Sequence, residues 1–286
     1  MRRRTTWIGV VLLALSALSV ILSPTLRAAA HDFLQGFRLR RLMVVPYTLS
    51  LNQDTAWTLH HILEGDLSFE SPEARPVQSL AEAEEALGFP VRRPAGVDDF
   101  VLMDVSLGAS IQWTVNVGRL REALQAASAE DVEVPEVLQG TVITVTVGPI
   151  FFGSFEFQGA IYAWLHAAPP VYTMQPKGDV RPLAEAALRL IGMPAAEARR
   201  LAQTVDWGTT LLLPIPLGPG ITLEVEPRSL GDREATLFTF PEMVHTPSGE
   251  ALPARMLLWS DDLGIYLIGG PNADPEQLLR WARSLR

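Results

Sequence analysis

Histidines and paired carboxylates are the residues of this 286-residue chain whose types could support catalysis or metal binding. A zinc site usually needs His, Cys or carboxylate ligands at fixed spacings, such as two histidines at i and i+4 of a helix. None of the five histidines has such a partner, and the chain contains no cysteine. We therefore predict no metal site, no disulfide and no thiol nucleophile. The histidines are His31, His60, His61, His166 and His245.

Motifs for nucleophilic catalysis and nucleotide binding are also missing from the sequence. Ser154 follows Gly153 in a strand-like segment and lacks the strand-to-helix turn of a G-x-S-x-G nucleophile. Residues 218–220, Gly-Pro-Gly, are not followed by the Lys-Ser/Thr of a phosphate loop. Glycosidase chemistry needs two carboxyl groups across a cleft, whereas adjacent acids are typical of turns and surfaces. The sequence thus predicts neither an enzyme nor a cofactor. The adjacent acids are Glu84-Glu85, Asp98-Asp99 and Asp261-Asp262.

Large aromatic side chains on the expected strands are the remaining candidates for a binding site. The chain has 7 tryptophans and 11 phenylalanines, enough to line an apolar pocket for a lipid or another apolar ligand. Packing in the core is the competing interpretation of the same residues. The candidate pocket residues are Trp113, Phe155, Phe157 and Trp259.

The charge of the chain argues against nucleic-acid binding. Four of the 23 basic residues precede residue 28, so 19 basic and all 32 acidic residues follow, a net charge of −13. Binding to a phosphate backbone needs a basic stripe, and the sequence shows none. We therefore exclude nucleic acid as a partner.

Residues 7–27 form the predicted membrane anchor. Residues 2–4 are arginines and precede a stretch, Trp7–Leu22, without a charged residue. A helix over residues 7–26 would be roughly 30 Å long at about 1.5 Å per residue, enough to cross the hydrocarbon core. The positive cluster orients the N-terminus toward the cytoplasm. We therefore predict a cytoplasmic stub at residues 1–6, a single-pass anchor in the cell membrane and an extracytoplasmic body.

A cleaved signal peptide is the alternative for the same segment. Residues 28–30 are alanines and offer an A-x-A cleavage site. Against cleavage, the apolar stretch is longer than the usual core of about 7 to 15 residues, and Pro24 and Arg27 stand before the alanines. Cleavage near Ala30 would give a secreted protein, so both interpretations export the body.

The exported part divides into a stem and a folded domain. We predict a juxtamembrane stem and linker at residues 28–76 and a single domain at residues 77–286. Residues 37–49 are expected to be extended until Pro46 interrupts them. Residues 66–76 contain Pro and Ser and are expected to be a linker.

Four segments of the domain alternate apolar and polar residues, the pattern of strands with one dry face. Strands of a parallel sheet buried on both faces would instead be continuously apolar. We therefore predict an α+β fold with an antiparallel β-sheet, one face of which is covered by helices. The strand segments are residues 110–117, 141–147, 154–165 and 221–227, and helices are expected at residues 79–88, 118–127, 180–191 and 194–205.

The prediction for residues 154–165 decides which aromatic residues face the core. If these residues form one strand, Phe155 and Phe157 face the core. Tyr162 and Trp164 then lie on the opposite face, away from it.

The C-terminal residues predict a hairpin followed by a helix. Apolar segments at residues 254–260 and 264–270 flank a turn at residues 261–264, and Asp274 is placed to cap a helix that begins at Pro275. Both faces of these strands are apolar. We therefore expect the hairpin at the centre of the sheet, beneath the helix, with the core between them.

Two segments resemble a bacterial family: VQSLAEAEEALGFPVRRPAGV at residues 77–97 and MLLWSDDLGIYLIGGPNADPEQLLRWARSLR at residues 256–286. The helix with G-F-P-V and P-x-G in the first segment, and the Trp, turn, Tyr and final helix in the second, are similar to a domain of unknown function. This domain is found at the extracytoplasmic C-terminal end of bacterial membrane-anchored anti-sigma factors. The two segments bracket about 210 residues.

The resemblance implies a lipoprotein-carrier-like architecture, in which a curved antiparallel sheet wraps over helices. It also implies a sensory or regulatory role outside the membrane, with a protein partner in the envelope. Anti-sigma factors of this family bind their sigma factor through a cytoplasmic domain, and residues 1–6 are too few to form one. The sequence therefore predicts a non-enzymatic, membrane-anchored regulatory domain without the sigma-binding function. An exported carrier that binds a lipid or other apolar ligand between sheet and helices is the alternative.

Overall fold

The computed structural model describes residues 41–48, 62–63, 65–70, 72–176, 178–217, 222–245 and 251–285. The predicted anchor at residues 7–27 lies outside these ranges, as do His31, His60 and His61. Within them, no helix combines the length and the apolar composition that a membrane crossing requires.

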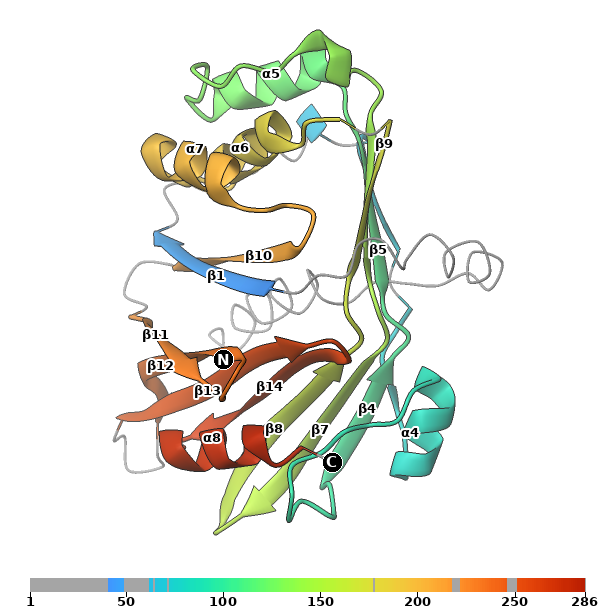
Figure 1. The fold of residues 1–286 in the computed structure, drawn as a ribbon, viewed down its shortest axis with the longest axis vertical. Coiled ribbons are helices and arrows are strands. Elements are labelled where there is room, and N and C mark those ends of the chain that lie inside the picture. Colours follow the sequence, from blue (N-terminus) through green and yellow to red (C-terminus); the bar gives the residue numbers. More distant parts are fainter. Residues whose placement is uncertain are drawn as a thin grey trace, which may run out of the picture.

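The described residues form an α+β fold of strands and five α-helices (Figure 1). The helices are α4 (Leu80–Leu87), α5 (Val117–Ala126), α6 (Arg181–Leu190), α7 (Ala195–Thr204) and α8 (Pro275–Arg283). The strands are β1 (Arg41–Thr48), β2 (Leu67–Glu70), β3 (Arg75–Pro76), β4 (Leu102–Ser106), β5 (Ala109–Thr114), β6 (Val142–Val147), β7 (Ile150–Phe157), β8 (Ala160–Ala167), β9 (Val171–Gln175), β10 (Thr210–Leu217), β11 (Glu224–Ser229), β12 (Glu234–His245), β13 (Ala251–Asp261) and β14 (Gly264–Pro271).

The strands form three sheets. An eight-stranded sheet has the order β11-β12-β13-β14-β8-β7-β4-β3, and a four-stranded sheet has the order β2-β5-β6-β9. All neighbours in these two sheets are antiparallel, whereas β1 and β10 pair in parallel as a two-stranded ribbon. The prediction of an α+β fold with antiparallel sheets is confirmed, and the parallel ribbon is an addition that the sequence did not indicate.

Three consecutive strand pairs connect the two antiparallel sheets. β4 leads into β5, β6 into β7 and β8 into β9, with breaks at residues 107–108, 148–149 and 168–170. The breaks contain glycine or proline, which interrupt ladder hydrogen bonds and permit sharp bends. At Gly148 the neighbouring break approaches so closely that a Cβ would lie 2.4 Å from the Cβ of Ala168. The sheets thus bend into one another along a line of small or cyclic residues.

Residues 154–165 form a hairpin, and the prediction of a single strand there was wrong. Gln158 and Gly159 have positive φ values of 52° and 79° and make a two-residue turn between β7 and β8. The turn pairs Phe155 with Tyr162, and directly paired residues share a face. Tyr162 and Trp164 are therefore buried on the same face as Phe155 rather than turned away from the core.

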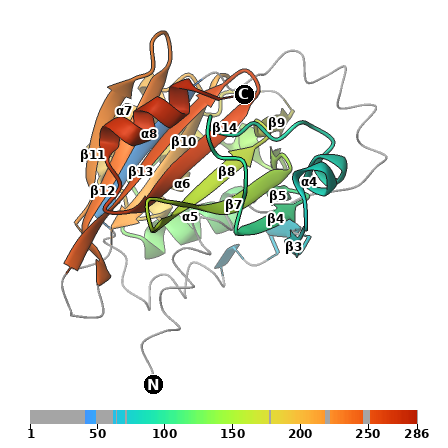
Figure 2. The same ribbon diagram turned by 90° about the horizontal axis from the view of Figure 1, so that it is seen from below.

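The C-terminal hairpin and helix are confirmed. β13 and β14 pair from Asp261 and Gly264 onward and are the third and fourth strands of the eight-stranded sheet. Helix α8 lies over β13 and β14 (Figure 2), and the Asp274 carboxylate accepts the backbone N–H groups of Glu276 and Gln277 at 3.2 Å each. The largest buried cluster lies between this helix and the sheet, as expected, and it includes Trp164, Leu257, Trp259, Tyr266, Ile268, Leu278, Leu279 and Trp281.

The predicted helices of the domain are also present. Ser79 Oγ accepts the backbone N–H of Glu82 at 3.2 Å at the start of α4, and Gly88 ends this helix with a φ of 74°. Helix α5 begins after Asn116, whose side chain accepts the N–H of Arg119 at 3.1 Å. Helices α6 and α7 form the expected pair and contact each other.

Residues 41–48 lie inside the body, so their assignment to a stem was wrong. Neighbouring side chains of the β1–β10 ribbon face opposite sides. Val44 packs toward the second face of the eight-stranded sheet, whereas Val45 and Tyr47 pack against helices α6 and α7. Pro46 does not end the strand but pairs with Ile215. A strand with one neighbour tolerates proline where its nitrogen points away from that neighbour.

The segment predicted to be a linker also contributes strands. β2 pairs with β5, and β3 pairs with β4, each at an edge of its sheet. Both faces of the eight-stranded sheet carry buried apolar residues, because the ribbon packs on the face opposite α8. The expectation of one dry and one solvated face therefore does not hold for this sheet.

We predict that a charge at Val45 destabilises the body, because Val45 is 8% exposed and packs against α7. Val45→Asp should lower the free energy of unfolding by about 3 kcal/mol or more, the cost of an unpaired buried charge. Met43→Asp is the matched control, since Met43 lies on the same strand but is 38% exposed, and it should cost less than about 1 kcal/mol. Denaturant unfolding of the full chain, followed by tryptophan fluorescence, measures both. Equal and small effects would mean that residues 41–48 are a stem after all.

Candidate functional site

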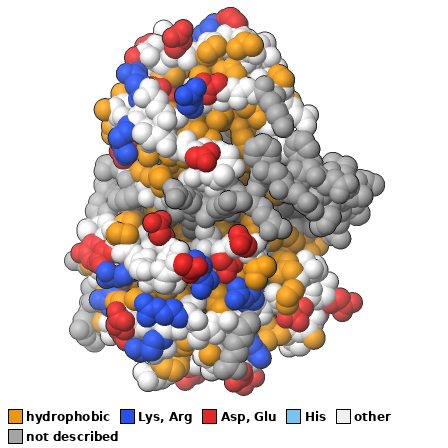
Figure 3. Space-filling view, viewed as in Figure 1, with side chains coloured by type: hydrophobic (Ala, Val, Ile, Leu, Met, Phe, Trp, Pro, Cys, Tyr) orange, Lys and Arg blue, Asp and Glu red, His pale blue; other side chains and the backbone are white. Residues whose placement is uncertain are grey.

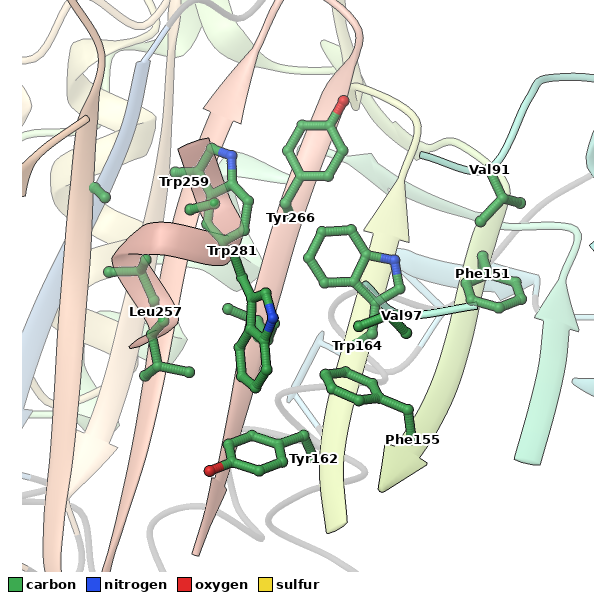
Figure 4. Packing of buried hydrophobic residues seen from close by; sticks show 14 of the residues in the cluster. Val91, Val97, Phe151, Phe155, Tyr162, Trp164, Leu257, Trp259, Tyr266 and Trp281 are labelled. Atoms are coloured by element: carbon green, nitrogen blue, oxygen red, sulfur yellow. The ribbon is translucent and has the colours of Figure 1, made fainter. Parts of the chain in front are cut away.

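Four directly opposed residues form a row across the centre of the eight-stranded sheet. Trp259 on β13 is paired with Tyr266 on β14, Tyr266 with His166 on β8, and His166 with Phe151 on β7. Each of these residues is at most 1% exposed. The ring centroids of Trp259 and Tyr266 are 5.4 Å apart, and those of Tyr266 and His166 are 4.7 Å apart, both stacked. Figure 4 shows Trp259 and Tyr266 on the neighbouring strands β13 and β14, and Phe151 on β7, beyond β8.

Next to this row, on the side of the Tyr266 hydroxyl, Asp261 closes the turn between β13 and β14. Its Oδ1 accepts the backbone N–H groups of Leu263 at 2.8 Å and Gly264 at 3.1 Å. The same oxygen accepts the hydroxyl of Tyr266 at 3.2 Å. The carboxylate therefore stabilises the turn in the way typical of Asp in turns, and the predicted turn position of Asp261-Asp262 is confirmed.

Two arginines from distant parts of the chain bind the other oxygen of Asp261. Arg92 Nη1 donates to Oδ2 at 2.9 Å and to the Tyr266 hydroxyl at 3.2 Å, and Arg233 Nη1 donates to Oδ2 at 3.2 Å. The Asp261 side chain is only 14% exposed, so these pairs are screened less than pairs on the surface. The network joins the loop after α4, the turn between β11 and β12 and the turn between β13 and β14.

His166 has one nitrogen in a hydrogen bond and one without a partner. Its Nδ1 accepts the backbone N–H of Arg92 at 3.2 Å, so the neutral ring must have its proton on Nε2. Nε2 is buried and has no hydrogen-bond partner among the described residues. A Cβ on Gly264 would lie 2.9 Å from Nε2, and the ring of Phe89 stands edge-on with its centroid 5.0 Å away. The imidazole is therefore packed tightly and shielded from water.

The pKa values of the buried groups fix their protonation states at neutral pH. Burial, together with the positive charge of Arg92, lowers the pKa of His166 from 6.5 to about 4, although the charge of Asp261 acts in the opposite direction. Burial raises the pKa of Tyr266 to about 12. His166 is thus neutral and Tyr266 protonated near pH 7. Neither group is poised for general acid–base catalysis, which works best with a pKa close to the working pH.

The structure separates the four candidate pocket residues. Phe155, Phe157 and Trp259 belong to the cluster beneath α8, whereas Trp113 packs in a different cluster with α5 and α6. Trp281 of α8 approaches Phe155 at 5.3 Å and Phe157 at 4.9 Å between ring centroids, edge-on in both cases. Phe155 and Phe157 therefore pack against Trp281, and Trp259 packs against Tyr266. Trp113 lies in another cluster, so the four residues do not line one common site.

Local patterns in the sequence do not indicate the network around Asp261. Arg92 lies in the loop after α4 and Arg233 in the turn between β11 and β12, and neither belongs to a motif with a known spacing. The one available signal was His166, a polar residue inside an otherwise apolar strand. Its partners could not be named without the strand order.

The described residues contain no group of three side chains that could hold a metal ion. Comparison with family profiles, curated proteins and solved structures gives no match. The resemblance to the anti-sigma factor domain therefore remains a prediction from residues 77–97 and 256–286.

We predict that Asp261→Asn lowers the free energy of unfolding by about 2 to 4 kcal/mol, because two guanidinium groups and two backbone N–H groups lose a carboxylate acceptor. Asp262→Asn is the matched control, since Asp262 is exposed on the same turn and should change stability by less than about 0.5 kcal/mol. Urea unfolding of the full chain in detergent measures both. If both variants unfolded at the same urea concentration as wild type, the network would not contribute to the stability of the fold.

Proposed function

We propose that this chain is a membrane-anchored extracytoplasmic domain that takes part in envelope signalling through contacts with other proteins, without chemistry of its own. The observation that carries the location is the uncharged stretch Trp7–Leu22 after the arginines at residues 2–4. Such a stretch, with positive residues before it, directs the rest of the chain across the membrane. The regulatory role is supported by the resemblance of residues 77–97 and 256–286 to the anti-sigma factor domain.

The position of β1 supports a body that stays close to the membrane. Only 13 residues, 28–40, separate Arg27 at the end of the proposed anchor from Arg41 at the start of β1. At about 3.5 Å per residue they reach at most about 45 Å. Because β1 packs between the sheet and helices α6 and α7, a force or displacement at the anchor would act directly on the interior of the body.

The buried polar network supports a structural rather than a catalytic role for the polar groups of the core. His166 and Tyr266 have pKa values far from neutrality in opposite directions. The Asp261 carboxylate is bound by two arginines and by its own turn. These groups hold distant segments together, which is what a domain acting through protein contacts requires.

The charge distribution supports a protein partner rather than a nucleic acid. The part of the chain after residue 27 has a net charge of −13, because it contains 19 basic and 32 acidic residues. On the face shown in Figure 3, basic side chains in the lower half are interspersed with acidic ones. Phosphate backbones need a continuous positive surface instead.

The alternative, a carrier of an apolar ligand, has weaker support from the proposed residues. Phe155 and Phe157 contact Trp281, and Trp113 lies in a different cluster. Organic extraction of the purified full chain, followed by mass spectrometry, tests this alternative. Recovery of a stoichiometric lipid would favour the carrier over the signalling domain.

We predict that a reporter enzyme that is active only outside the cytoplasm is active when fused after Arg286. The matched control replaces Arg2, Arg3 and Arg4 with Glu, which removes the positive cluster that sets the orientation, and should reduce reporter activity severalfold. Immunoblotting confirms that both fusions are expressed. A C-terminal reporter that is active only in the cytoplasm would refute the proposed location.

Fractionation of bacteria that express the full chain distinguishes an anchored from a secreted protein. The full chain should stay in the membrane fraction after a carbonate wash, and mass spectrometry should find no mature N-terminus at Ala30 or His31. Release by carbonate, or a new N-terminus at these residues, would establish the secreted alternative.

A further inference from the structure

Residues 89–97, here called the strap, connect α4 to the strand region and lie against the edge of the aromatic row. Val91 and Val97 of the strap are buried in the same cluster as Trp164 and Phe151 (Figure 4). The strap is also bound at both ends. The N–H of Val91 donates to Glu84 Oε1 at 2.9 Å, and the N–H of Ala95 donates to Ser284 Oγ at 3.0 Å.

Between these ends, the backbone of Arg92 makes both of its polar contacts with strand β8. Its N–H donates to His166 Nδ1 at 3.2 Å, and its C=O accepts the indole N–H of Trp164 at 3.1 Å. Its guanidinium binds Asp261 and the hydroxyl of Tyr266. The seating of the strap on the sheet therefore depends on an imidazole nitrogen that must remain an acceptor.

We propose that His166 is an acid-sensitive latch: proton uptake at Nδ1 turns this acceptor into a donor that faces the Arg92 N–H, and the strap is released from the aromatic row. The proton comes from solvent, and no other bond changes. Two opposed donors cannot share a hydrogen bond, so the ring or the strap must move. The ring is held on the sheet by strand β8 and stacks on Tyr266, and Gly264 lies so close to Nε2 that a Cβ there would be only 2.9 Å away, which leaves the ring no room to move in that direction. The strap contains no helix or strand, so between its two bound ends it is the part that moves.

Burial and the charge of Arg92 make the protonated ring unfavourable while the strap is seated, although the charge of Asp261 acts in the opposite direction. Arg92 comes from the strap, Asp261 from β13, Arg233 from the turn after β11, and Tyr266 from β14. The Asp261 charge is already shared by two arginines and by the backbone of its own turn, and Glu84 of α4 is bound to the strap itself. Nε2, which would share the positive charge, has no acceptor among the described residues.

The direction of the pH effect is set by linkage between proton binding and release. The seated ring has a pKa of about 4, and a solvated ring has one near 6.5. The equilibrium between seated and released strap therefore does not change with pH above about pH 6.5. It shifts toward the released strap as the pH falls toward 4, below which it changes no further. The two pKa values correspond to a shift of about 300-fold in the equilibrium between seated and released strap.

This latch does not depend on the proposed location, but it would give an extracytoplasmic domain a response to external acid. Release uncovers His166 and Tyr266, together with Val91 and Val97 of the strap, and so exposes apolar surface that is buried while the strap is seated. An acid-dependent apolar surface is a means of recruiting a protein partner only at low pH.

Hydrogen–deuterium exchange of the full chain in detergent, measured by mass spectrometry between pH 7.5 and 4.5 and corrected for intrinsic exchange, tests the latch. Peptides that cover residues 89–97 should lose protection by tenfold or more as the pH falls, while peptides from α5 keep theirs. His166→Asn is the matched variant, because its Oδ1 can accept the Arg92 N–H from the position of Nδ1 but does not titrate. His166→Gln is a second non-titrating variant in case Asn does not fold.

The outcomes separate the latch from simple acid unfolding. Loss of strap protection in wild type but not in the His166 variants supports the latch. The same loss in wild type and variants, or a loss that spreads equally to α5, would overturn it. Since the chain has no native cysteine, the double variant Ala95→Cys and Ser284→Cys offers a further check. A disulfide between these neighbours should hold the strap and abolish the acid response, and reduction should restore it.

Discussion

The carboxylate of Asp261 is mostly buried at the end of the central hairpin, and a buried carboxylate needs partners for both of its oxygens. Leaving such a group unsatisfied costs more than a surface salt bridge contributes, so its partners are constrained to stay where they are. One oxygen binds the turn and the Tyr266 hydroxyl, and the other binds Arg92 and Arg233. Three segments that are far apart in the sequence are thereby fixed around one hairpin turn. The position of the Arg92 guanidinium in turn places the Arg92 amide against His166.

The aromatic row beneath this network shows how sheet register determines chemistry. Trp259, Tyr266, His166 and Phe151 lie in one row because four neighbouring strands place them directly opposite one another, and the first three are stacked. The row removes His166 from water and leaves its Nε2 without a partner, which is why the imidazole stays neutral. A core histidine of this kind is structural at neutral pH, and the same packing makes its protonation disruptive.

The parallel ribbon changes how the body relates to the proposed anchor. β1 and β10 lie between the second face of the eight-stranded sheet and helices α6 and α7, with Val44 facing the sheet and Val45 facing the helices. A flexible stem would isolate the body from the membrane. Because β1 is buried in the body, it would couple the body mechanically to the proposed anchor.

Elements with local signals can be predicted from the residues alone. Alternating residues indicated β5 and β6, the Ser79 and Asp274 caps placed α4 and α8, and the apolar hairpin at residues 254–270 was expected at the centre of the sheet, where it lies. The remaining features depend on contacts between segments that are far apart in the sequence. A two-residue turn at Gln158-Gly159 reversed the faces of Tyr162 and Trp164, because a turn resets the alternation that a single strand would continue. The ribbon of β1 with β10, and the meeting of Arg92, Arg233 and Asp261, depend on which strands are neighbours. Strand order is a property of the whole chain, since it is set by the burial of complete sheet faces, and no short pattern of residues encodes it.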